Sequence, residues 1–552
     1  MGNDRLRQVC LAIGSGLLAG LALPPLGLPP LLWGALALLW SLAAPGEQGA
    51  SRQPGRVRQF VAAPRRTADE PLSPAPLPSS LPPLAGGLRS RPLGQVPAAF
   101  AAWLPHVVAL EGLLWGLAAV LLSHRWLLWL HPLDWIGVPG PLSLPLCLLL
   151  WLLIALAGGL LVGLWLALMR RLGPTRLSTA LIGSALWGLA EVALARGPLF
   201  WIGVGAAALP GDPALAGVAA LGGAGLLAAL QVLIGWGLWW VFRSGAGRRR
   251  RFLLCLGLVL AAHLAGLAAL AAVAPDDGPR ERVLLLQPAI PTRRKFEAAE
   301  QLRLLRQLAL AQRAAVGMAR TLVLPEGALA LGQPLPEPAP VEVLSGGFRL
   351  EGLEHRSSLL RFAPGDVVAD QWLDKHRLVP LGEWVPASGL LRWSGLSAVG
   401  GLQSGPPSRL LRRPEGPVAV AICYELSDGR ALASASRDGA QWLLASANLD
   451  PYPLLLQQQF TALARLRAIE SGRWLVSAAN TGPSLAVDPR GVVRSQLPAG
   501  RSVRAAVEIH RLQAPTGYLR WGEGPLLVLL VLGVVLRLIA QRGWWGSRPE
   551  AP

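Results

Sequence analysis

Long apolar runs alternate with short polar segments over the first half of the chain, and one long polar block follows them. A membrane-spanning helix needs about 20 mostly apolar residues. Runs that approach or exceed this length lie near 9–27, 28–44, 106–123, 141–168, 178–195, 214–242, 252–274 and 524–541. Arg5 and Arg7 precede the first run as in a signal peptide, but no small-residue cleavage site follows, so we interpret the run as a retained anchor. The pattern predicts a polytopic α-helical membrane protein with about eight spans, seven of them before residue 275.

Two shorter segments and one insert lie between these runs. The stretches 126–138 and 199–208 are too short to span, and their tryptophans favour positions at the membrane interface. Residues 45–105 are rich in Pro, Arg, Ala and Ser and show no sustained periodicity, so we expect a disordered cytoplasmic linker. The predicted parts are a membrane domain at 1–275 that contains this insert, a polar block at 276–520, and a C-terminal span with a cytoplasmic tail at 521–552.

The polar block alternates short buried strands with helices. Runs typical of buried strands lie at 283–287, 321–325, 418–422, 442–445 and 474–478, and helical patterns lie near 297–317 and 454–471. On the first of these helices, we expect one face to carry Leu302, Leu305, Leu308 and Ala309. Interleaved strands and helices indicate an α/β fold, in which sites gather at the carboxyl ends of strands.

Composition excludes a wholly soluble chain. Charged residues make up 15% of the 552, where soluble domains carry about 25%, and the mean hydropathy is +0.44. The net charge of +19 would suit nucleic acid if it lay on one folded face, but much of it lies in arginine clusters between apolar runs. These clusters alternate from loop to loop, which predicts a cytoplasmic N-terminus. We therefore expect a multi-pass protein of the inner (plasma) membrane that binds no nucleic acid and whose polar block faces the periplasm.

Cysteine and lysine are both rare in this chain. Only Cys423 lies in the polar block, and the other three cysteines fall within apolar runs: Cys10, Cys147 and Cys255. This scatter forms no disulfide framework and no metal-ligand spacing, so we expect neither a metal nor a cofactor. Two of the 51 basic residues are lysines, Lys295 and Lys375.

Three residues of the polar block combine into a candidate site. Glu326 and Cys423 each follow a predicted strand, and Lys375 lies in the segment DKHRLVPLGEWVP. Each alone has an ordinary interpretation, as a solvated carboxylate, a core thiol and a loop charge. Together they supply the nucleophile, base and cation that acyl transfer through cysteine requires.

Three motifs around these residues resemble the carbon–nitrogen hydrolase (nitrilase) superfamily, whose site is a Glu–Lys–Cys triad. They are LPEGALAL, DKHRLVPLGEWVP and VAICYE. With the predicted spans, the chain resembles the apolipoprotein N-acyltransferase family. The resemblance implies an α-β-β-α sandwich for the polar block and catalytic roles for Glu326, Lys375 and Cys423. It also implies supporting roles: Glu383 would orient the lysine, while Tyr424 and Glu425 would support the cysteine's loop, Glu425 alternatively as a structural carboxylate.

The resemblance further implies a two-step reaction. The Cys423 thiolate would attack an acyl ester of a membrane phospholipid, with Glu326 as base and Lys375 on the oxyanion. The amino group of a lipoprotein's diacylglyceryl-cysteine would then take the acyl group from the thioester. Two departures stand out, because the family usually has Thr or Ser where this chain has Gly327, and a tryptophan that the segment 446–452 lacks.

Two other classes of function are compatible with parts of the sequence. A membrane-tethered amidase or nitrile hydrolase would use the same triad, but it would leave eight spans unexplained. A transporter with an outer domain would require charges within its spans, where the sequence offers chiefly Glu111 and Glu191.

Overall fold

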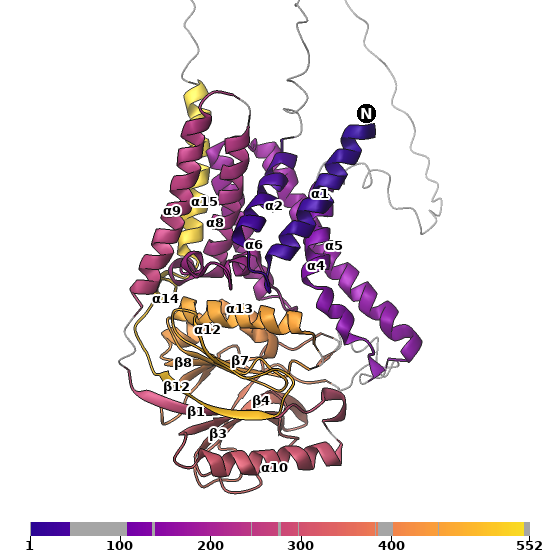
Figure 1. The fold of residues 1–552 in the computed structure, drawn as a ribbon, viewed down its shortest axis with the longest axis vertical. Coiled ribbons are helices and arrows are strands. Elements are labelled where there is room, and N and C mark those ends of the chain that lie inside the picture. Colours follow the sequence, from indigo (N-terminus) through magenta and orange to yellow (C-terminus); the bar gives the residue numbers. More distant parts are fainter. Residues whose placement is uncertain are drawn as a thin grey trace, which may run out of the picture.

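The computed structural model describes residues 2–44, 108–134, 138–243, 245–273, 278–295, 297–380, 382–384, 401–450 and 452–545. The predicted linker at 45–105 lies outside these residues. The described chain forms a bundle of apolar helices at one end and an α/β part at the other, and the bundle stands on the α/β part (Figure 1). All the long apolar helices therefore lie on one side of the two sheets.

A helix occupies each of the eight positions where we expect a span. They are α1 (Gly2–Ala22), α2 (Pro29–Leu42), α4 (Leu110–Ser123), α5 (Gly140–Leu172), α6 (Leu177–Ala195), α8 (Ala219–Phe242), α9 (Arg248–Ala271) and α15 (Gly524–Trp545). Among the described residues, five of these helices (α5, α6, α8, α9 and α15) are long and apolar enough to cross a membrane. Helices α2 and α4 have 14 residues each. The count of eight spans therefore stays a prediction.

The two short segments form no long helix. They contain the 3₁₀ turns η2 (Arg125–Leu130) and η4 (Val204–Ala208), and the short helix α7 (Pro213–Ala216) follows. Two carboxylates within apolar helices have partners. Glu111 pairs with Arg170 at 2.9 Å, and Glu191 accepts hydrogen bonds from Trp187 and from the Val204 backbone.

The α/β part contains two six-stranded sheets. Their orders are β12-β1-β2-β3-β4-β5 and β11-β10-β9-β8-β7-β6. The strands are β1 (Arg280–Gln287), β2 (Thr321–Val323), β3 (Glu342–Glu351), β4 (Glu354–Phe362), β5 (Gln371–Asp374), β6 (Leu410–Leu411), β7 (Val418–Ile422), β8 (Trp442–Ala447), β9 (Leu475–Ala479), β10 (Leu485–Val487), β11 (Val493–Gln496) and β12 (Val503–His510). All five predicted strands are present, with ends that differ by up to three residues.

Alternation along the strands builds the layers, because successive side chains of a strand point to opposite faces. In β1, Val283 and Leu285 enter the core between the sheets, whereas Leu284 and Leu286 pack against helix α10 (Ala298–Ala315). In β7, the valines point between the sheets and the alanines point to the helical layer that contains α12 (Gly429–Arg437) and α13 (Leu454–Ser471). The part is therefore an α-β-β-α sandwich, as the resemblance implied.

The expected buried face of α10 is wrong in part. Leu302 is 48% exposed, and the residues that pack on the sheet are Leu304, Leu308, Ala311 and Ala315. These positions follow the i, i+4, i+7 spacing of one helical face. The spacing 302–305–309 satisfies the same rule, and packing against the sheet selects the other face.

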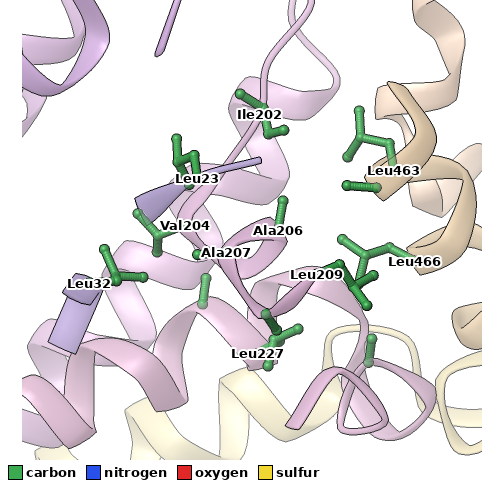
Figure 2. Packing of buried hydrophobic residues seen from close by; sticks show 14 of the residues in the cluster. Leu23, Leu32, Ile202, Val204, Ala206, Ala207, Leu209, Leu227, Leu463 and Leu466 are labelled. Carbon is green, nitrogen blue, oxygen red and sulfur yellow. The ribbon is translucent and has the colours of Figure 1, made fainter. Parts of the chain in front are cut away.

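Helix α13 joins the two parts of the molecule. Most of its 18 residues are buried, and one continuous hydrophobic cluster contains its leucines, the second sheet and the apolar helices. Figure 2 shows Leu463 and Leu466 of α13 facing Ala206 and Leu209 of the helical part. Each buried leucine of this kind contributes roughly 1.5–3 kcal/mol. The α/β part is thus fixed against the bundle by a hydrophobic interface.

Candidate active site

The two sheets bring three strand ends to one edge of the sandwich. Lys375 directly follows β5, Cys423 directly follows β7, and Glu326 lies three residues after β2. Strands β2 and β3 are parallel, and β4 is antiparallel to both β3 and β5, so β2 and β5 run in the same direction. Their carboxyl ends therefore meet at the same edge, and the cysteine approaches from the facing sheet.

Lys375 lies between two carboxylates. Its side chain is 1% exposed, and its ammonium donates to Glu326 Oε1 at 2.8 Å and to Glu383 Oε1 at 2.7 Å. Burial disfavours the ammonium, but the two carboxylates outweigh burial and raise the pKa of Lys375 well above its usual value. The lysine is consequently a fixed positive charge throughout the physiological pH range.

The second oxygen of each carboxylate is held by the backbone. Glu326 Oε2 accepts from the Asn448 N–H at 3.1 Å, and Glu383 Oε2 accepts from the Val379 N–H at 2.9 Å. Gly346 of β3 lets the segment that carries Glu326 approach closely, since a Cβ there would lie 2.4 Å from the Glu326 Cα. Gly327 has φ +62°, a conformation that glycine adopts without strain, unlike the Thr or Ser usual in the resembled family.

Cys423 occupies a sharp turn between β7 and the 3₁₀ turn η7 (Cys423–Ser427). Its φ is +55°, which is uncommon for a residue with a side chain. Burial and the negative charge of Glu326 raise the pKa of the Cys423 thiol well above its usual value, against the opposing charge of Lys375, and the thiol hydrogen-bonds Glu326. The resting Cys423 is therefore a neutral thiol whose proton has an adjacent acceptor.

Glu425 ties the lysine's loop to the cysteine's turn. It is 3% exposed, and Oε1 accepts from the backbone N–H groups of His376 and Arg377 at 2.9 and 3.0 Å. Oε2 accepts from the Ile422 N–H at 2.9 Å, and Arg409 donates to both oxygens. These contacts are compatible with both interpretations of Glu425, as a support of the cysteine's loop and as a structural carboxylate.

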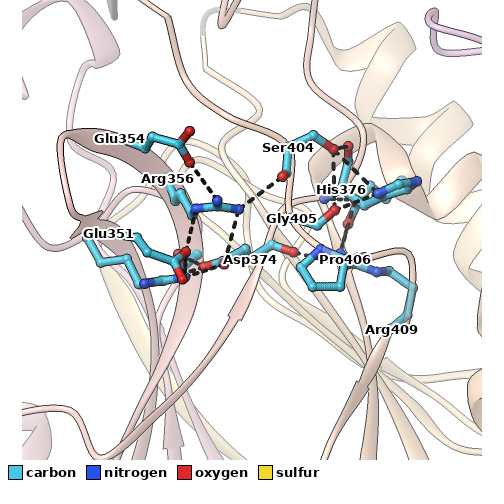
Figure 3. A network of polar contacts seen from close by, with 12 residues as sticks. Glu351, Glu354, Arg356, Asp374, His376, Ser404, Gly405, Pro406 and Arg409 are labelled. Carbon is cyan, nitrogen blue, oxygen red and sulfur yellow. Dashed lines mark hydrogen bonds and ion pairs between the residues drawn. The ribbon is translucent and has the colours of Figure 1, made fainter.

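A polar network surrounds the strand that delivers Lys375 (Figure 3). Arg356 contacts Glu351, Glu354 and the Ser404 carbonyl, and it lies 3.8 Å from Asp374. Arg409 donates to the carbonyls of Asp374 and Pro406, and the Gly405 N–H donates to the Lys375 carbonyl. The backbone on both sides of the lysine is thereby fixed.

An apolar cavity of about 180 Å³ opens beside Cys423. The α/β part lines it with Tyr424, Leu449, Tyr452, Leu456 and Phe460, and the helical part lines it with Trp126, Leu127, Leu130, Leu146, Leu150, Ile154 and Phe200. The Trp126 and Tyr452 rings pack edge to face, with centroids 5.5 Å apart. Although the segment 446–452 lacks a tryptophan, Trp126 of η2 supplies one to the cavity.

Tyr424 lines this cavity and also packs against the guanidinium of Arg377. Its hydroxyl donates to the Leu378 carbonyl at 3.1 Å, and the Arg377 guanidinium lies 4.6 Å from its ring centroid. Burial raises the pKa of Tyr424 to about 12, so its hydroxyl keeps its proton. The residue forms part of the cavity wall beside Cys423.

The structure brings together all six residues that the sequence singled out, and it adds others. Lys295, to which no motif assigned a role, lies close to Glu326 and Glu383. Asn448 and Tyr452 also reach the site, and only the altered segment 446–452 pointed to them. In the part of the chain that the structure describes, no three His, Cys, Asp or Glu side chains form a group that could hold a metal ion.

A Glu–Lys–Cys constellation at the strand ends of an α-β-β-α sandwich is the arrangement that the resemblance to the carbon–nitrogen hydrolases implied. The model of the Carbon-nitrogen hydrolase family matches residues 358–514, which include Lys375 and Cys423. Among solved structures, Saccharomyces cerevisiae Nit3, a member of branch 10 of the nitrilase superfamily, aligns over 93% of its length and 43% of this chain, with 16% identity and a TM-score of 0.33.

Relatives that match over most of this chain are more specific. The apolipoprotein N-acyltransferase of Prochlorococcus marinus (strain MIT 9313) is 50% identical over 475 residues, covering 83% of this chain and 94% of that protein. That of Parasynechococcus marenigrum (strain WH8102) is 47% identical, covering 82% and 97%. This chain belongs to the apolipoprotein N-acyltransferase family, and it is a multi-pass membrane protein.

Proposed function

We propose that this enzyme transfers a fatty acyl group from a membrane phospholipid to the N-terminal amino group of a lipoprotein's diacylglyceryl-cysteine, through a thioester on Cys423. The observation that carries the proposal is the apolar cavity beside Cys423, whose wall is shared by the α/β part and the apolar helices. An acyl chain suits such a cavity, whereas a small soluble amide does not need it.

The first step forms the thioester. Glu326 takes the thiol proton as the Cys423 sulfur attacks the ester carbonyl, and the Lys375 ammonium stabilises the oxyanion. The tetrahedral intermediate collapses, the ester C–O bond breaks, and the protonated Glu326 returns its proton to the glycerol oxygen. A lysophospholipid leaves, and the acyl group stays on sulfur.

The second step transfers the acyl group to nitrogen. The neutral amine of the acceptor attacks the thioester carbonyl, and Glu326 takes the proton that the nitrogen loses. The C–S bond breaks, the thiolate recovers that proton, and a triacylated lipoprotein leaves. Glu383 and the Val379 N–H keep the lysine in place, so one oxyanion site serves both steps.

The proposed topology follows the charge pattern. Arginine clusters that alternate between loops favour eight spans, a cytoplasmic N-terminus and an α/β part on the periplasmic side of the inner membrane. The position of every long apolar helix on one side of the sheets supports a site at the membrane surface (Figure 1). Both lipid substrates would then reach the cysteine from the same leaflet.

The experiment that tests this proposal is mass spectrometry of the Cys423 peptide. Purified protein is mixed with phospholipid vesicles without an acceptor, and the expected result is one fatty acyl adduct on Cys423 together with free lysophospholipid. A synthetic diacylglyceryl-cysteine peptide should then remove the adduct and become acylated. Release of free fatty acid with no acylated peptide would instead favour the alternative of a membrane-anchored hydrolase of the nitrilase type.

A further inference from the structure

Lys295 occupies a built position beside the catalytic carboxylate. It follows the 3₁₀ turn η5 (Thr292–Arg294), and its half-buried side chain places the ammonium 5.4 Å from the Phe348 ring centroid. The same nitrogen is 3.0 Å from the point where a Cβ on Gly327 would lie, one residue after Glu326. The mechanism proposed above does not use this cation.

The turn that carries Lys295 is fixed to the far side of the site. The Thr292 N–H donates to Asp450 Oδ2 at 2.7 Å, and the Thr292 hydroxyl donates to the Asp450 carbonyl at 3.0 Å. Asn448, whose N–H binds Glu326, also hydrogen-bonds the Thr292 hydroxyl. These hydrogen bonds therefore fix the position of Lys295 relative to Glu326.

The chemistry of the first step says what lies beside Glu326. This residue protonates the departing glycerol oxygen, so the glycerol backbone of the donor must be next to it, and the phosphate is only a few bonds further along. We propose that Lys295 binds the phosphate of the donor phospholipid, and this assignment rests on the proposed function. The acyl chain in the cavity and the phosphate on Lys295 would then hold the ester between them.

The burial of the Lys295 ammonium favours a negatively charged partner. Burial lowers the pKa of Lys295, opposed by the charges of Glu326 and Glu383, so an additional negative group would stabilise its ammonium. Arg293 on the same turn is exposed and donates to the Pro132 carbonyl at 3.2 Å, next to Leu133, which lines the cavity. Two cations of η5 and its end thus lie along the side of the site where the headgroup would be.

The test compares two acyl donors in Lys295→Gln. One donor is phosphatidylethanolamine in vesicles, and the other is a p-nitrophenyl fatty acyl ester, which has no phosphate; both are followed by thioester formation on Cys423. We expect the KM for the phospholipid to rise about ten- to hundredfold, the effect of losing one hydrogen bond to a charged group. The p-nitrophenyl ester should keep a much larger share of its wild-type rate than the phospholipid, and that remaining activity shows that the variant is folded. Lys295→Arg should restore most of the phospholipid activity.

A matched control removes an equal charge from the same turn. Arg294 pairs with Glu297 at 3.1 Å and with Glu300 at 3.5 Å, so Arg294→Gln should leave both donors unaffected. Equal loss with both donors in Lys295→Gln, or no loss with either, overturns the assignment. A wild-type protein that forms a thioester only from the p-nitrophenyl ester would refute the phospholipid donor itself.

Discussion

Replacing Lys375 tests the electrostatic centre of the site. In Lys375→Met, Glu326 and Glu383 lose the ammonium that lies 2.8 and 2.7 Å from them, while both remain largely buried. Removing one partner from a buried ion pair costs on the order of 3–5 kcal/mol, and one carboxylate will take up a proton to reduce that cost. Losing the oxyanion donor costs a further factor of about 10²–10³ in rate.

Lys375→Arg separates charge from geometry. The lysine is 1% exposed, so the planar and larger guanidinium cannot occupy the same space between the carboxylates without displacing them. We expect thioester formation to fall about a hundredfold or more even though the positive charge is kept. The control is Arg313→Lys, because Arg313 lies on α10 and forms an exposed ion pair with Glu337.

The assay is single-turnover thioester formation from phospholipid, with membrane insertion and thermal unfolding measured for each variant. The pKa of Lys375 is raised in the fold, so its stabilising charge is fully present below its ordinary value of about 10.4 and is lost only as the pH rises through the higher folded value. No loss of stability through this lysine is therefore expected between pH 6 and pH 10, in rough terms. A Lys375→Arg enzyme with the wild-type rate would mean that the lysine is a structural charge and that the assigned triad is wrong.

Four further predictions concern the cysteines, Glu326, the topology and the insert. Cys423→Ala should abolish thioester formation, while joint replacement of Cys10, Cys147 and Cys255 by alanine should leave it largely intact. An acylated Cys423→Ala protein would contradict the mechanism. Glu326→Gln should abolish acyl transfer and lower the pH at which Cys423 is alkylated, because the carboxylate raises the thiol pKa. An unchanged alkylation profile would mean that Glu326 does not act on the Cys423 thiol. Cysteine placed at Leu353, which is 98% exposed at the β3–β4 turn, should react with an impermeant reagent from the periplasmic side, and reaction only after the inner membrane is opened would reverse the topology. Deleting residues 48–95 should preserve acyl transfer, and loss of activity at normal protein levels would assign the insert a function.

Much of the fold could be predicted from local pattern. Helix α13 begins and ends where its periodicity predicted, and β7 matches its apolar run, since alternation and helical spacing are properties of consecutive residues. The buried face of α10 could not be chosen in this way, because two faces of the helix satisfy the spacing and the sheet decides between them. The span count also depends on helix lengths that apolar runs do not determine, as the 14 residues of α2 and α4 illustrate.

The candidate site also contains residues that local motifs predict and residues that only long-range contacts bring together. Glu326, Lys375 and Cys423 could be named because each lies in a motif of its own, and Glu326 and Cys423 also follow predicted strands. Lys295 and Asn448 could not, since the contacts that bring them to the site join segments about 150 residues apart, as the Thr292–Asn448 hydrogen bond shows. Trp126 is a similar case, because it reaches the cavity from the helical part rather than from the α/β part.

The position of α13 has a consequence for biogenesis. This helix packs on the second sheet with one face and on the apolar helices with another. The helices before residue 272 are synthesised before α13, so they are available to cover its outer face when it is made. An isolated α/β part would expose leucines such as Leu463 and Leu466 to water and aggregate. The hydrophobic face of α13 therefore couples the folding of the α/β part to that of the apolar helices.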